Sequence, residues 1–299
     1  MKYLIYMAVA LLALSSCQEK VDLSDIEGRE KLVVYSFPGK NDTLFIYVSK
    51  SLPTNSNKKQ TFKLTGVKCS YEGQQRNVNY KGTGNDPILS EVYYVTGSLR
   101  SGTEVRIEVS AEDLPTVYAT SVLPPKPEIL STAIDTVFLK GEWFTQLRVQ
   151  FSNDADAAYY GVRVIGVEKT EYQTSEEIQS VNTNSEPLLN GNSDADISFG
   201  TSNDYYHNMY IFENSQIKGT SYTLHLNLQN KKYVPCYKVQ LYRITKDYYS
   251  FLKSLNDVDN NSLSNYGMSL MSPTYTNVTN GIGVLGLCSV VESPWIGSR

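Results

Sequence analysis

Short segments in which apolar and polar residues alternate recur along this chain, and they constrain its fold more than any other feature. The alternation is strict at residues 105–109 and 222–228, and residues 43–49 repeat it. A period of two residues is that of a β-strand with one buried face. Gly, Pro, Asn and Asp separate the segments, a spacing typical of β-sandwiches. The sequence therefore predicts a mostly β protein with two Ig-like β-sandwich domains in tandem.

Three prolines within residues 124–127 mark the clearest break in this pattern. Proline cannot donate a hydrogen bond to a strand and favours a stiff, extended path. We therefore expect a linker at 125–127 between an N-terminal β-sandwich domain at 31–124 and a C-terminal β-rich domain at 128–299. Residues 168–204 are rich in Ser, Thr, Asn and acidic residues, and we expect them to form an irregular polar insertion in the second domain.

One short amphipathic helix is predicted near the C-terminus, at residues 246–256. Its apolar residues follow the i, i+3, i+4, i+7 spacing of one helical face, and they are Tyr248, Phe251, Leu252 and Leu255. Thr245 precedes the helix and belongs to the residue types that cap a helix N-terminus. An isolated helix of this length is marginal in water, so we expect its apolar face to pack on the sheet of the second domain.

The N-terminal segment predicts export and lipid attachment. A cationic start precedes an apolar run at residues 4–14, which is shorter than the about 20 residues of a transmembrane helix and is typical of a signal peptide. The run ends in Leu14-Ser15-Ser16-Cys17, which looks like a bacterial lipobox. We therefore expect removal of residues 1–16, acylation of Cys17, and a polar tether at 17–30. An ordinary signal peptide with an incidental cysteine is the alternative.

Charge and cysteine spacing argue against several classes of partner. The formal net charge is −4 and no basic block is present, which argues against nucleic acid. No Cys-x-x-Cys spacing occurs, so no zinc or dithiol site and no cofactor is predicted. Besides Cys17, we expect Cys69 to be a small buried residue. Pairing of Cys236 with Cys288 stays open, because it requires neighbouring strands.

No catalytic residues are predicted. The two histidines, His207 and His225, are separated in the sequence, and no Gly-x-Ser-x-Gly segment supports a hydrolytic triad. The glycine-rich tail at 277–286 lacks the strand–helix context of a dinucleotide-binding loop, so it predicts a closing strand.

A calcium loop is one candidate site. Oxygen-bearing residues occupy alternate positions, as calcium loops require, and they are Asn190, Asn192, Asp194 and Asp196. Ala195 and Thr201 stand where such a loop has Gly and Glu, so a polar turn is the alternative.

Two further candidates concern surface contacts. Tyr205, Tyr206 and His207 form an aromatic segment that would suit a ligand-contact loop, with an ordinary surface loop as the alternative. Thr43 and Thr136 each follow Asp and precede an apolar residue, which resembles the O-glycosylation acceptors of exported Bacteroidota proteins.

Segments along nearly the whole chain after Cys17 resemble a known family. They are the lipobox and residues 31–35, 42–51, 114–125, 247–255 and 275–283. On these segments the chain is similar to Bacteroidota lipoproteins of domain-of-unknown-function family 4249. That family has no established activity, and similar proteins tend to be encoded near TonB-dependent transporters.

The resemblance implies an outer-membrane lipoprotein that faces the cell exterior and acts as a non-catalytic binding or accessory component of TonB-dependent nutrient uptake. The expected partners are the lipid bilayer, through acylated Cys17, and a TonB-dependent outer-membrane transporter. The alternatives are a structural or adhesive surface lipoprotein and an envelope hydrolase. A pocket with paired carboxylates would favour the hydrolase, an exposed Tyr-rich patch would favour binding, and an unpaired sheet edge would favour assembly.

Overall fold

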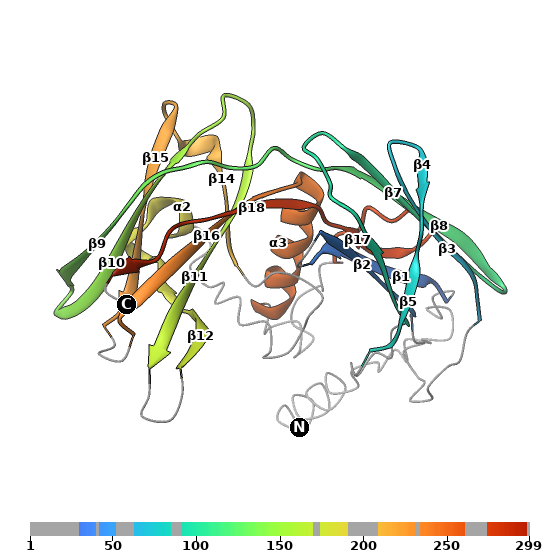
Figure 1. Ribbon diagram of the computed structural model, residues 1–299, viewed down its shortest axis with the longest axis horizontal. Coiled ribbons are helices and arrows are strands. Elements are labelled where there is room, and N and C mark those ends of the chain that lie inside the picture. Colours follow the sequence, from blue (N-terminus) through green and yellow to red (C-terminus); the bar gives the residue numbers. More distant parts are fainter. Residues whose placement is uncertain are drawn as a thin grey trace, which may run out of the picture. The chain divides into compact units, whose positions relative to one another are not determined.

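Strands make up most of the computed structural model, so the predicted mostly β class is confirmed (Figure 1). The structure describes residues 30–39, 42–51, 63–84, 91–169, 174–190, 209–230, 234–260 and 274–297. Within these ranges the strands form four sheets, which we name A to D. The sheets pack in two sandwich-like pairs, A with B and C with D, around separate apolar clusters.

Sheets A and B form the first sandwich. The strand order in sheet A is β17 (Ile282–Leu285), β1 (Leu32–Pro38), β2 (Thr43–Lys50), β6 (Glu91–Thr96) and β5 (Asn79–Thr83). The order in sheet B is β4 (Gln74–Arg76), β3 (Leu64–Tyr71), β7 (Glu104–Ala111) and β8 (Leu114–Val122). Alternation explains the packing, since Leu44, Ile46 and Val48 all lie in the shared core as their spacing predicts.

Sheets C and D form the second sandwich. The strand order in sheet C is β13 (Val181–Asn182), β15 (Ser221–Gln229), β10 (Glu142–Ser152) and β9 (Ile129–Leu139). The order in sheet D is β12 (Thr174–Gln179), β11 (Tyr159–Lys169), β16 (Cys236–Ile244) and β18 (Cys288–Glu292). Two short strands extend sheet D, because β14 (Tyr210–Glu213) pairs with β11 and β19 (Ile296–Gly297) pairs with β16.

Two-residue hairpin turns join several of these strands. Glu72 and Gly73 connect β3 to β4, and Lys140 and Gly141 connect β9 to β10, with positive φ at all four residues. Turns with two positive φ angles match the right-handed twist of paired strands. Glycine at the second position of each turn therefore fixes the register of its hairpin.

The C-terminal tail returns to the first sandwich, which differs from the expected domain division. Strand β17 pairs in parallel with β1, and Val278 and Leu287 lie in the core between sheets A and B. Residues 128–299 therefore do not form one separate domain. The chain passes to the second sandwich at the predicted linker, returns to the first between β16 and β17, and passes to the second again after β17. At the linker, the hydroxyl of Ser289 donates a hydrogen bond to the carbonyl of Pro124 at 2.7 Å.

Helix α3 (Lys246–Asn260) confirms the predicted amphipathic helix and extends it. The backbone N–H of Tyr248 donates to the hydroxyl of Thr245 at 3.3 Å, so the predicted cap is present. Three residues of the apolar face are buried, and they are Tyr248, Phe251 and Leu252. The expected docking surface was incomplete, because this face contacts Phe37 on β1 as well as β14 and β16 of the second sandwich.

Part of the segment 168–204 is regular, contrary to the expected irregular insertion. It contains the end of β11, strands β12 and β13, a 3-10 turn at Thr183–Ser185 and the one-turn helix α2 (Pro187–Asn190). A second 3-10 turn lies at Asn214–Gln216. The sequence is polar here because β12 is an edge strand with most side chains exposed, and a strand of that kind needs few apolar residues.

None of the cysteines in the described part of the chain forms a disulfide. Cys69, Cys236 and Cys288 are all buried thiols. Strands β16 and β18 are neighbours, but Cys288 lies opposite Ile244 whereas Cys236 lies opposite Gly297 at the other end of β16. This placement rules out the disulfide left open above. Burial raises the pKa of Cys69 and Cys288 to about 12, so neither is a reactive thiolate at neutral pH.

None of the described helices combines the length and apolar character that a membrane-spanning helix needs.

Candidate functional site

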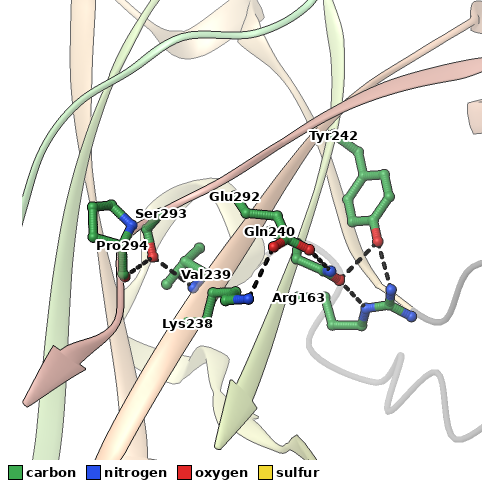
Figure 2. Close-up of polar contacts among 8 residues, drawn as sticks. All are labelled: Arg163, Lys238, Val239, Gln240, Tyr242, Glu292, Ser293 and Pro294. Carbon is green, nitrogen blue, oxygen red and sulfur yellow. Dashed lines mark hydrogen bonds and ion pairs between the residues drawn. The ribbon is translucent and has the colours of Figure 1, made fainter.

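A polar row crosses the face of sheet D that points away from the core of the second sandwich. Strand register places Arg163 of β11 opposite Gln240 of β16, and Gln240 opposite Glu292 of β18. Lys238 lies two residues from Gln240 and therefore on the same face. We call Arg163, Lys238, Gln240 and Glu292 the polar row; Figure 2 shows their side chains meeting across the three strands.

Direct hydrogen bonds join every member of the polar row. The Arg163 Nε donates to Gln240 Oε1 at 2.8 Å, and Gln240 Nε2 donates to Glu292 Oε1 at 2.6 Å. Lys238 Nζ donates to the second carboxylate oxygen of Glu292 at 3.0 Å. Hydrogen bonds from Gln240 and then Lys238 lower the pKa of the Glu292 carboxyl. The row therefore presents charges of both signs, held in place by hydrogen bonds, on a rigid sheet surface.

Aromatic side chains lie at both ends of the polar row. Tyr242 accepts a hydrogen bond from Arg163 Nη2 at 2.6 Å and donates one to Gln240 Oε1 at 2.9 Å. Burial raises the pKa of the Tyr242 phenol, so it remains a neutral donor. At the other end, the Lys238 ammonium lies 4.6 Å from the ring centroid of Trp295. Fixed charges beside an aromatic ring can contact a polar ligand that also has an apolar face.

The end of β18 is fixed in place beside the row. Ser293 accepts a hydrogen bond from the Val239 N–H at 2.9 Å and donates one to the carbonyl of Pro294 at 2.7 Å (Figure 2). The backbone N–H of Ser293 also donates to the carbonyl of Val239. These contacts position Glu292 and Trp295 on either side of Ser293.

A pocket of about 360 Å³ lies at the loop of residues 153–158, beside Glu213 and Ser215. The buried side chain of Asn214 organises this loop. Its Nδ2 donates to the carbonyls of Asp154 and Asp156 at 3.1 and 2.9 Å, and its Oδ1 accepts the Ala158 N–H at 2.8 Å. The Asp154 carboxylate pairs with Arg243 at 2.5 Å. The polar groups of this loop thus form hydrogen bonds and an ion pair within the protein, which indicates that the loop has a structural role.

The buried carboxylate of Glu186 fixes the segment before α2 to β15. One oxygen accepts the Tyr222 hydroxyl at 2.8 Å and the Leu188 N–H at 3.2 Å, and the other accepts the His225 N–H at 2.7 Å. The His225 Nδ1 lies 3.7 Å from that second oxygen, beyond hydrogen-bond distance. Both carboxylate oxygens of Glu186 therefore accept hydrogen bonds from groups other than the His225 side chain. This arrangement indicates a structural role for Glu186.

Glu186→Gln is expected to lower the free energy of unfolding by about 1–3 kcal/mol, because the new amide group would face a donor and leave it unsatisfied. Chemical denaturation followed by circular dichroism measures this loss. Glu112→Gln is the control, since Glu112 pairs with Lys63 on the exposed surface and such pairs contribute about 0–1 kcal/mol. Equal stabilities for the two variants would contradict the role given to Glu186.

The sequence profile of the family described as "Domain of unknown function (DUF4249)" matches residues 19–293. The matched region contains both sandwiches, helix α3 and the returning tail. The chain belongs to the DUF4249 family. A comparison with curated proteins found no match.

Most candidate residues predicted for this DUF4249 chain lie outside the described residues. These are Cys17, Asn192, Asp194, Asp196, Tyr205, Tyr206 and His207. Of the proposed calcium ligands, only Asn190 falls within the described residues, and it is the last residue of α2. Across the described ranges, no group of three or more His, Cys, Asp or Glu side chains could hold a metal ion.

The two predicted O-glycosylation sites lie on strands. Thr43 begins β2 and is half-buried, whereas Thr136 is exposed on β9. An attached glycan needs an exposed hydroxyl, so Thr136 is the more accessible of the two. Modification of either residue stays a prediction.

Sequence reasoning missed the polar row of this DUF4249 chain. Its members come from three strands and are separated by up to 129 positions, so no local spacing joins them. Each one appears in the sequence only as a polar position of an alternating strand. The nearest signal is the strict alternation at 238–242, which places Lys238, Gln240 and Tyr242 on one face.

Proposed function

We propose that this chain is a Bacteroidota-type outer-membrane lipoprotein that faces the cell exterior and is anchored through acylated Cys17. It acts there as a non-catalytic binding or accessory component of TonB-dependent nutrient uptake. The observation that carries the proposal is the sequence Leu14-Ser15-Ser16-Cys17 after a short apolar run. Membership of the DUF4249 family supports it, because the matched region begins at residue 19, two positions after the proposed anchor.

The polar row is the surface that we assign to ligand or transporter contact. Its side chains are held by one another, so little conformational entropy is lost when a partner binds. Glu292 is about half exposed, with 47% of its side chain accessible, and Trp295 provides an aromatic surface beside it. Paired charges beside an aromatic ring suit the binding of a ligand or a transporter, and such binding involves no catalysis.

Cys17→Ser is expected to abolish membrane attachment. The unsubstituted chain should partition into detergent and resist a carbonate wash, whereas the variant should appear in the soluble fraction or as an unprocessed precursor. A single acyl chain binds membranes only weakly, so stable attachment requires the complete lipid modification. Retention of the Cys17→Ser chain on washed membranes, fully processed and detergent-soluble, would overturn the lipoprotein proposal.

Affinity capture of the lipid-anchored chain from solubilised membranes tests the accessory role. A TonB-dependent transporter should be recovered in a fixed ratio to the chain. The pair of substitutions Arg163→Ala and Glu292→Ala should lower that ratio, while Lys63→Ala and Glu112→Ala remove an exposed ion pair elsewhere and should leave it unchanged. Recovery of no such transporter would argue against the uptake role, and an unchanged ratio would place the contact elsewhere.

One observation favours the second candidate function, a structural or adhesive surface lipoprotein. Strand β9 has a free edge in the described part of sheet C, and free edges support assembly.

A further inference from the structure

Strand β9 is a long edge strand of sheet C, and the short strand β19 of the facing sheet lies near it. It has 11 residues, and none of the described strands pairs with its outer edge. Proteins commonly protect edges with Lys, Pro, bulges or short strands. Between Ile129 and Leu139 there is no Lys or Pro, the bulge lies at the first residues, and the one charged residue, Asp135, pairs with Arg148 at 2.6 Å.

Three other edge strands of the described sheets are protected. Strand β8 contains Pro115, and its Tyr118 is bridged to Thr279 of the returning tail. Strand β5 has five residues with a bulge and Lys81, and β12 has six residues including two glutamates. Compared with these three strands, β9 has a longer stretch of edge without Lys, Pro or a central bulge.

Apolar side chains gather along the same edge. Ile134 and Phe138 lie on the sheet face that contributes to the core, yet they are exposed by 38% and 57%. Phe138 packs on Trp143 of β10 with ring centroids 5.0 Å apart, and Trp143 is 60% exposed. An edge strand with uncovered apolar residues is typical of an interface.

We propose that a second copy of this chain occupies the edge, with the two β9 strands antiparallel and sheet C continuous across both copies. The twofold axis of such a pair is perpendicular to the sheet, so equivalent faces lie on the same side. Residues of the two strands then oppose one another symmetrically about one central residue.

The pairing centres on Ile134. This register pairs all 11 residues of β9, because Ile129 of one copy then lies opposite Leu139 of the other. It places Ile134 opposite Ile134, and Thr132 opposite Thr136. Apolar and Thr–Thr cross-strand pairs of this kind stabilise sheets.

The position of the charged residue Asp135 favours the same register. With Ile134 at the centre, Asp135 of one copy lies opposite Ala133 of the other. A shift of the centre to Asp135 would place the two Asp135 carboxylates opposite each other, which is destabilising. The edge therefore fits another copy of itself, and it does so in one alignment.

Cysteine cross-linking of the full chain in detergent tests the register. With a short bis-maleimide, Ile134→Cys should give a cross-linked dimer, whereas Thr132→Cys or Thr136→Cys alone should give no more than the unsubstituted chain. A mixture of the Thr132→Cys and Thr136→Cys chains should cross-link. Dimer formation by Thr132→Cys alone, or none by Ile134→Cys, would overturn the proposed pairing.

Charge substitution tests the interface itself. Ile134→Lys places two ammonium groups opposite each other, so sedimentation velocity should show monomer where the unsubstituted chain is a dimer. A mixture of Ile134→Lys and Ile134→Glu chains should restore the dimer. Ile178→Lys, at an exposed isoleucine on β12, is the matched control and should remain dimeric.

The thermal melt of each variant is compared with that of the unsubstituted chain, so that unfolding is not mistaken for dissociation. A chain that is monomeric at every concentration, a dimer that survives Ile134→Lys, or a Lys and Glu mixture that stays monomeric would contradict the proposal. These outcomes are independent of Cys17 and of transporter binding.

Discussion

Phe251→Ala should lower the free energy of unfolding by about 3–5 kcal/mol, the range measured when a buried aromatic side chain is removed from a core. Phe251 is 2% exposed on helix α3. Its ring centroid lies 5.6 Å from that of Tyr35 and 6.1 Å from that of Phe37, both on β1. The substitution therefore removes contacts with the first sandwich and leaves a cavity beneath the helix. Urea denaturation followed by circular dichroism measures the loss.

Lys253→Ala is the control for Phe251→Ala. Lys253 lies on the exposed side of the same helix, so its removal should change stability by no more than about 0.5 kcal/mol. A helix that packs on a separate partner would give a different result. In that case Phe251→Ala would leave the denaturation curve unchanged and would weaken only partner capture.

The position of α3 makes its packing important for more than one sheet. Tyr249 contacts Tyr159 of β11 with ring centroids 4.9 Å apart, while Tyr248 contacts Phe37 of β1 at 5.0 Å. The carboxylate of Asp247 also accepts hydrogen bonds from Tyr275 and Asn277, which precede β17. Loss of the helix packing should therefore weaken the contact between the two sandwiches, so that the unfolding transition broadens or splits.

The local part of the fold could be predicted from the sequence because it depends on neighbouring residues. Alternation predicted the strands, and the spacing from Tyr248 to Leu255 predicted the helix. Each of these signals lies within one element, where side chains three or four positions apart in a helix, or two apart in a strand, share a face.

Partners distant in the sequence could not be predicted in this way. The parallel pairing of Val34 with Gly283 joins segments about 250 positions apart, and alternation does not say which sheet a strand enters. The polar row could not be predicted for the same reason. Arg163, Gln240 and Glu292 come from three strands, and only the register of those strands brings them together. The polar composition at 168–204 was misleading, since an exposed edge strand and a loop share it.

Gly283→Ala should have the larger effect of two glycine substitutions, because it acts at the contact between the tail and β1. Gly283 has a φ of +119°, and an added Cβ would overlap the carbonyl oxygen of Val34. Backbone strain of this kind costs about 1–3 kcal/mol. Displacement of β17 would also expose Val284 and Leu285, each of which contributes about 1.5–3 kcal/mol by burial. We expect a total loss of more than about 4 kcal/mol in the free energy of unfolding.

Gly219→Ala separates the two contributions to this loss. Gly219 has a similar φ of +114°, but an added Cβ there would have no atom within 4 Å. Its substitution therefore introduces only backbone strain, about 1–3 kcal/mol. Hydrogen exchange should show lost protection at β1 in Gly283→Ala and native protection there in Gly219→Ala. Equal losses of stability with β1 still protected would mean that the first sandwich does not depend on the returning tail, and residues 31–124 would then fold without it.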